Sequence, residues 1–185
     1  MIAWKPLFTG IKPTHAFLWC VSIALLLRFP FFFRDYLNWD ESTFIIMGQS
    51  LADGNLPYTQ LWDLKPPLVF YFFSALISFF GKSLFAIRFA GALVIGITSF
   101  FVYQAARQYR IRYAGVCAIL VLYFSSLFGA IQGVMSEHIA MLPFLAACYL
   151  FLFKSRKTIG WLGAAFCFGL AVMCRLNLIY PILFL

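Results

Sequence analysis

The acidic side chains of this sequence are concentrated in one polar stretch, residues 38–68, while the long segments elsewhere are apolar and almost uncharged. Carboxylates can accept protons or bind divalent cations, and partial removal from water makes them more basic. The stretch therefore has the ionisable groups that acid–base chemistry requires. Of the six acidic residues, Glu137 stands alone and the other five lie in or just before the stretch: Asp35, Asp40, Glu41, Asp53 and Asp63.

Asp40 and Glu41 begin an expected short helix over residues 41–51. One interpretation makes Asp40 the N-cap, where Asp is favoured without any further function. The other makes Asp40 a general base, which accepts a proton from a hydroxyl nucleophile. In that case Glu41 would orient the acceptor, or bind a divalent metal together with Asp40.

A lysine lies just before a second expected helix, over residues 68–80. Asp63 and Lys65 precede Pro66-Pro67, and proline is favoured in the first turn of a helix. An Asp–Lys pair at a surface contributes little to stability. The functional interpretation places the Lys65 ammonium against a phosphate, which a helix N-terminus also favours.

Further charged residues stand at the ends of apolar segments. Glu137 suits the first turn of a helix, but a lone carboxylate at the end of a membrane helix is also a site hypothesis. His138 beside it is a weaker candidate as a metal ligand. Arg175, and more weakly Arg88, would either extend to the lipid headgroups or bind a lipid phosphate.

Composition indicates a membrane protein. The chain is 64% hydrophobic and 11% charged, with 24 Phe, and a soluble domain could not bury that much apolar surface. The net charge of +8 does not indicate nucleic-acid binding, because the basic residues stand at the ends of apolar runs. The five cysteines lie inside apolar segments without metal-ligand spacing.

We expect an all-α polytopic protein in which the spans are residues 15–33, 84–106, 113–133, 138–153 and 159–174. The apolar run 178–185 would start another span and indicates that the polypeptide is incomplete. The two short helices would lie at the membrane interface, in a first outer loop over residues 34–83. Cytoplasmic loops carry an excess of Lys and Arg, and here the expected cytoplasmic residues are Lys5, Lys12, Arg107, Arg110, Arg112, Lys154, Arg156 and Lys157.

This topology places five charged residues from distant parts of the chain on the same outer side of the membrane. They are Asp40, Glu41, Lys65, Glu137 and Arg175. Several ordered fragments accompany them: Asp40-Glu41, Gly54 with Leu56-Pro57-Tyr58, Asp63 to Leu68 with Tyr71, Phe85-Ala86 with Arg88, Ser136-Glu137, and Gly169-Leu170-Ala171 with Arg175. Together these fragments resemble the N-terminal module of GT-C fold glycosyltransferases, in particular the dolichyl-phosphate-mannose protein mannosyltransferases and aminoarabinose transferases.

The resemblance implies an inverting transfer of a hexose or pentose from a polyprenyl-phosphate carrier to a lipid, glycan or protein hydroxyl. The reaction would take place on the periplasmic or luminal face, with the bacterial inner membrane as the expected location. Asp40 would be the base, and Glu137 the second acidic position, near the site or its metal. The residues implied for substrate and phosphate binding are Lys65, Arg175, Asp63, Tyr58 and Arg88.

Two other functions remain open at this point. A transporter or flippase of polyprenyl-linked sugars would also bind phosphate at the membrane, but it should place charges inside the spans, where this sequence has almost none. A catalytically silent scaffold is the third possibility. No cofactor is certain from these residue types. A divalent metal held by Asp40, Glu41, Glu137 or His138 is the one that the sequence would allow.

Overall fold

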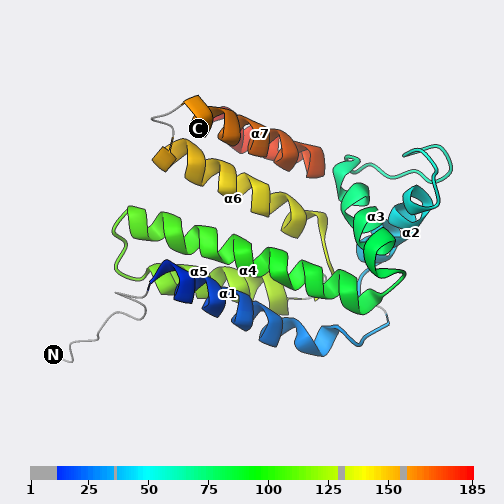
Figure 1. The fold of residues 1–185 in the computed structure, drawn as a ribbon, viewed down its shortest axis with the longest axis horizontal. Helices are drawn as coiled ribbons and strands as arrows, with labels where there is room; N and C mark the ends of the chain where they lie inside the picture. The colour runs from blue at the N-terminus through cyan, green and yellow to red at the C-terminus, as the bar shows by residue number, and fades with distance from the viewer. Residues whose placement is uncertain (1–11, 36, 129–131, 155–157) are drawn as a thin grey trace.

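The computed structural model describes residues 12–35, 37–128, 132–154 and 158–185, and every regular element in these ranges is a helix. The all-α prediction is therefore confirmed. Figure 1 shows the elements in order: α1 Pro13–Arg28, η1 Phe29–Phe31, α2 Trp39–Ala52, α3 Leu68–Phe80, α4 Leu84–Gln108, α5 Ala114–Leu127, α6 Ser136–Lys154, α7 Thr158–Cys174, η3 Leu176–Leu178 and α8 Ile179–Leu183.

The long helices run back and forth along one direction, and α2 and α3 pack together across one end of them (Figure 1). Helix α4 is central, because it packs against α1, α5 and α6, while α7 packs on α6. Because consecutive helices of the bundle run in opposite directions, alternate helix ends lie at the α2–α3 end. That end receives the C-terminal ends of α1, α5 and α7 and the N-terminal ends of α4 and α6.

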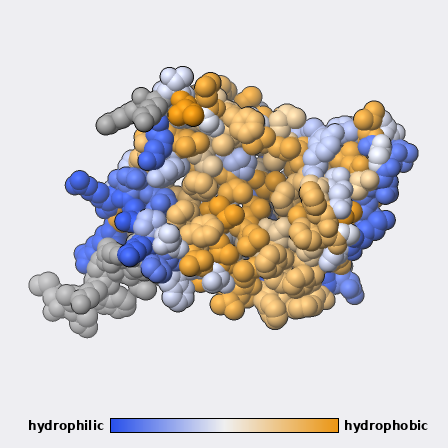
Figure 2. Space-filling view, viewed as in Figure 1, coloured by the Kyte–Doolittle hydropathy of each residue, from blue (hydrophilic) through white to orange (hydrophobic). Residues whose placement is uncertain are grey.

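Within the described residues, three helical segments are long and apolar enough to cross a membrane: Pro13–Phe31, Leu84–Gln108 and Ser136–Lys154. At about 1.5 Å per residue, α4 is about 37 Å long, more than the hydrocarbon core requires. The predicted spans at 113–133 and 159–174 appear as shorter apolar helices, α5 and α7. Figure 2 shows apolar side chains over the middle of the molecule and polar ones at both ends, as a bilayer-spanning bundle requires.

The basic loop residues lie at the end of the bundle opposite to α2 and α3. Arg107 is in the last turn of α4, Arg110 and Arg112 follow it, and Lys154 ends α6. Lys5, Arg156 and Lys157, which we predicted on the same side, lie outside the described residues. The order of the helices therefore separates these basic residues from the acidic stretch 38–68.

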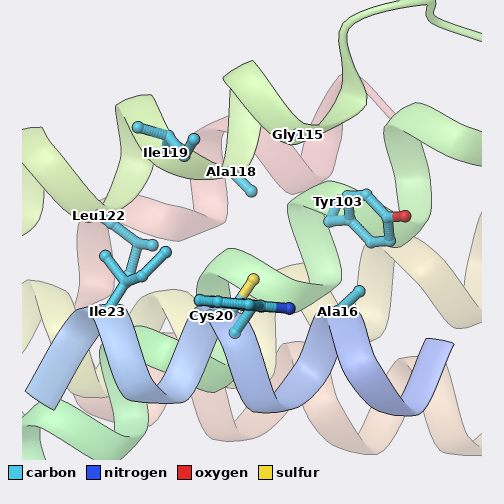
Figure 3. Close-up of a pocket in the computed structure, with 9 residues that line it drawn as sticks. Ala16, Cys20, Ile23, Tyr103, Gly115, Ala118, Ile119 and Leu122 are labelled. Carbon is cyan, nitrogen blue, oxygen red and sulfur yellow. The ribbon is translucent and has the colours of Figure 1, made fainter. Parts of the chain in front are cut away.

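Small residues allow α1, α4 and α5 to approach closely. A Cβ at Gly96 of α4 would lie 2.8 Å from the Cα of Val21 on α1, so the two backbones are in contact at this position. Figure 3 shows the neighbouring space between the three helices, lined by residues such as Ala16, Cys20 and Ala118. Its volume is about 20 Å³ and its lining is apolar. It is therefore a small gap in the packing of the three helices and too small for a substrate.

Helices α2 and α3 have the predicted extents to within a few residues, and local signals explain their ends. Gly54, with φ +93°, turns the chain after α2, and Gly81, with φ +70°, ends α3. Both values lie in the left-handed region that favours glycine. Phe44 and Phe73, which are completely buried, hold the two helices together.

Candidate active site

The candidate site lies at the α2–α3 end, where four charged side chains form two ion pairs. Each pair joins residues that are distant in the sequence. One pair links the first turn of α2 to the loop before α3, and the other links the first turn of α6 to the residue after α7. The helix order places all four groups at the same end of the bundle.

Asp40 and Lys65 form the first pair, with Oδ2 and Nζ 3.8 Å apart and side chains that are 40% and 32% exposed. The cap of α2 is Asn38, whose side chain accepts a hydrogen bond of 2.7 Å from the backbone N–H of Asp40. The N-cap interpretation of Asp40 is therefore wrong. Because Asn38 satisfies the helix start, the Asp40 carboxylate is left to face Lys65 and solvent.

Two residues shape the loop that presents Lys65. The Tyr58 hydroxyl donates a hydrogen bond of 2.7 Å to the carbonyl oxygen of Lys65, and Asp63 Oδ1 accepts one of 2.9 Å from its backbone N–H. Burial, followed by the nearby Asp63 carboxylate, raises the pKa of Tyr58, so its hydroxyl stays a donor at neutral pH. Tyr58 and Asp63, predicted to bind substrate, thus contact the backbone of Lys65.

Glu137 and Arg175 form the second pair, with side chains that are 40% and 30% exposed. Glu137 Oε2 also accepts a hydrogen bond of 3.0 Å from the hydroxyl of Ser136. The pair joins α6 to the end of α7, where the chain becomes extended at Arg175. A second acidic group and a second cation thus lie at the same end of the bundle as Asp40 and Lys65.

Glu41 and Arg88 are buried rather than available to substrates. Their side chains are 2% and 1% exposed, and Arg88 Nη2 lies 3.0 Å from Glu41 Oε2. Glu41 Oε1 also accepts a hydrogen bond of 2.8 Å from the backbone N–H of Val134. The structure therefore gives both residues internal partners instead of the acceptor, metal or lipid phosphate that the sequence indicated.

Arg28, in the last turn of α1, is also buried, although a basic residue at the end of a span commonly extends to the headgroups. Its side chain is 1% exposed and donates to the carbonyl oxygens of Ser125, Gln132 and Gly133 at 3.0, 2.6 and 2.9 Å. Sequence reasoning missed this role. A charge inside an apolar run needs a partner, so the sequence indicates a buried contact for Arg28. It does not indicate which residues provide that contact.

The four side chains considered as metal ligands do not gather in one place. Glu41 is paired with Arg88, and His138 Nδ1 accepts a hydrogen bond of 3.3 Å from the backbone N–H of Met135. Across the described ranges, no three His, Cys, Asp or Glu side chains are close enough to hold a metal ion. This donor set therefore does not fit a metal ion.

Two cavities border the site. A groove of about 430 Å³ lies between α3, α4, α6 and α7 and is almost entirely apolar, with Leu68, Tyr71, Ile139 and Cys174 among its lining residues. Three of these stand within three residues of a charged group of the site. A second cavity of about 280 Å³ lies between α4, α5 and α6, and Glu137 lines it.

The bundle of apolar helices, with charged groups at one end and an apolar groove near them, defines the class of a membrane-embedded helical protein. The sequence pattern of the dolichyl-phosphate-mannose-protein mannosyltransferase family matches residues 64–185, more than half of the chain. The chain belongs to this family. No match was found among curated proteins or among solved structures.

Family membership makes the protein a membrane glycosyltransferase of the mannosyltransferase type, which acts on a sugar donor and an acceptor. The matched range begins at Leu64, so it includes Lys65, Glu137 and Arg175 but not Asp40. Asp40 is connected to the matched part by its contact with Lys65.

Proposed function

We propose that the protein transfers a sugar from a polyprenyl-phosphate donor to an acceptor hydroxyl, with inversion at the anomeric carbon and Asp40 as the general base. The observation that carries this proposal is the apolar groove of about 430 Å³, two of whose lining residues, Leu68 and Cys174, stand close to cations in the chain. Leu68 is three residues from Lys65, and Cys174 immediately precedes Arg175. A polyprenyl phosphate has the matching shape, a long apolar tail and an anionic head.

The two ion pairs are suited to exchange with such a donor. Their side chains are about one-third exposed, and pairs of this kind contribute only ~0–1 kcal/mol. A phosphate that binds Lys65 and Arg175 releases the carboxylates of Asp40 and Glu137 from their partners. The site thereby gains a free base when the donor arrives.

The reaction then follows from these groups. The acceptor hydroxyl gives its proton to Asp40 as its oxygen attacks the anomeric carbon of the donor sugar. The bond between that carbon and the phosphate oxygen breaks, and its electron pair stays on the polyprenyl phosphate. Lys65 and Arg175 stabilise the negative charge where it develops. Glu137 lines the cavity of about 280 Å³, and Ile139, two residues further along α6, lines the groove, so donor and acceptor can meet near this helix end.

Orientation is part of the proposal. Arg107, Arg110, Arg112 and Lys154 would lie in the cytoplasm by the positive-inside rule. The site would then be on the outer face, and the expected membrane is the bacterial inner membrane. The order of the helices supports this orientation, because it places the basic residues and the site at opposite ends of the bundle.

The test is sugar transfer from a panel of polyprenyl-phosphate sugars by membranes that contain the protein. We expect Asp40→Asn to lower kcat about 10²–10⁴-fold, the usual contribution of a general base, while donor binding is retained. Asp53→Asn is the matched control, because it makes the same chemical change at the exposed C-cap of α2. Transfer that Asp40→Asn leaves intact would contradict the base assignment, and donor movement across the bilayer without transfer would favour a flippase.

A further inference from the structure

Glu41 adjoins Asp40 in the chain, yet its side chain points into the protein. It contacts α4 through Arg88 and accepts a hydrogen bond from the backbone N–H of Val134, three residues before Glu137. One buried carboxylate thus connects the helix that carries Asp40 to the 132–135 segment, which leads directly into α6 and Glu137. The two ion pairs of the candidate site are linked through it.

Further hydrogen bonds surround this connection. Arg88 Nη1 donates to the carbonyl oxygen of Phe31 at 2.7 Å and to that of Arg34, in the segment between α1 and α2. From α1, Arg28 holds the carbonyl oxygen of Gly133 at 2.9 Å. A buried pair whose polar atoms are engaged in this way cannot shift without leaving a charge or a hydrogen-bonding group unpaired.

Two glycines show how tightly the 132–135 segment is held. A Cβ at Gly133 would lie 3.2 Å from both Cβ and Cδ of Glu41. On the side of α4, a Cβ at Gly91 would lie 2.5 Å from Cγ2 of Val134. The segment therefore lies between Glu41 and α4 at separations that an added methyl group could occupy only if a neighbouring group shifted.

We propose that Glu41 is a positioning residue: with Arg88 it holds the 132–135 segment and so sets the place of Glu137 relative to Asp40. This inference rests on the proposed function for its catalytic consequence. Glu41 is too buried to contact substrate, so it acts through the segment. A displacement of about 1 Å in an active site can cost about 10²-fold in rate, which makes such a support consequential.

The first measurement is amide hydrogen exchange of the full chain in lipid nanodiscs, and it does not depend on activity. We expect Glu41→Ala to speed exchange of the Val134 amide at least tenfold and to leave the middle of α6 unchanged. Gly133→Ala keeps both charges and should act in the same direction, so it serves if Glu41→Ala fails to fold. Asp53→Asn is the control and should change nothing.

The second measurement is the kinetics of sugar transfer by the same variants. We expect Glu41→Ala and Gly133→Ala to lower kcat at least tenfold with the donor KM within threefold, because Lys65 and Arg175 are untouched. Unchanged exchange at Val134, or faster exchange with unchanged kcat, would overturn the positioning role. If the wild-type protein transfers no sugar, the proposed function fails, while the exchange measurement still decides whether Glu41 holds the segment.

Discussion

The charged residues at the α2–α3 end divide into two groups by burial. Both ion pairs of the candidate site have side chains that are 30–40% exposed, whereas Glu41 and Arg88 are 2% and 1% exposed. An exposed pair can exchange partners with little change in free energy, and a buried pair cannot. Exposure therefore suits the first group to substrates and the second to fixing the backbone.

Tyr58 offers a test of how the loop presents Lys65. Tyr58→Phe removes the hydroxyl that donates to the Lys65 carbonyl oxygen at 2.7 Å. A net hydrogen bond contributes about 0.5–1.5 kcal/mol, so we expect the donor KM to rise about 2–10-fold with little change in kcat. The exposed Tyr109 at the opposite end provides the control variant Tyr109→Phe. An unchanged donor KM would show that Lys65 does not depend on this contact.

The ionisation of Tyr58 gives a pH prediction. Burial and then Asp63 raise its pKa from the ordinary value of 10.0, so the folded protein holds this proton more tightly than the unfolded chain does. Its contribution to stability is therefore fully present below pH 10 and is lost as pH rises through the higher, folded-state pKa. The difference in phenolate absorbance between wild type and Tyr58→Phe should have its midpoint above pH 10. A titration centred below 10 would be inconsistent with the buried hydroxyl.

At the scale of elements, the contact between α2 and α3 determines where Asp40 and Lys65 meet. Gly48 on α2 makes this contact possible, because a Cβ there would lie 2.6 Å from the Cβ of Phe73 and 3.0 Å from the backbone nitrogen of Ser74. Backbone atoms cannot move aside as a flexible side chain can. The two helices therefore behave as one unit that carries both members of the first ion pair.

Gly48→Ala should consequently destabilise the protein by about 1–3 kcal/mol, the usual cost of overpacking. Gly169→Ala on α7 is the matched control, because a Cβ there meets nothing within 4 Å. That change should be neutral or stabilising, since alanine favours a helix over glycine. Thermal unfolding in detergent measures both. Equal stability of the two variants would mean that α2 and α3 separate more easily than the structure indicates.

At the scale of the whole molecule, an apolar middle separates the site from the basic loops. Cysteine labelling can test the proposed orientation, with the five native cysteines first replaced. A membrane-impermeant maleimide should label Asp53→Cys from outside intact cells and Arg112→Cys only after permeabilisation. Labelling in the reverse pattern would place the site in the cytoplasm and remove the proposed donor side.

Much of the fold was predictable because its signals are local. The extent of α3 follows from the prolines before Leu68 and the glycine after Phe80, and the length of α4 follows from one uninterrupted apolar run. The ends of α5 were less predictable: it spans Ala114–Leu127, although the apolar composition continues to residue 133. Composition indicates what a bilayer accepts, but not where backbone hydrogen bonding ends.

The sequence by itself determined that this is an all-helical membrane protein with its carboxylates and a lysine at one end, because apolar length and charge position are properties of single segments. Only the tertiary structure decided which charges face substrate. Asp40 and Glu41 are neighbours in the chain, but one is 40% exposed and the other buried against Arg88. Arg28 resembled a headgroup anchor and is buried against the 132–133 carbonyls. Burial of a charge depends on partners that lie far away in the chain, and folding alone brings them together.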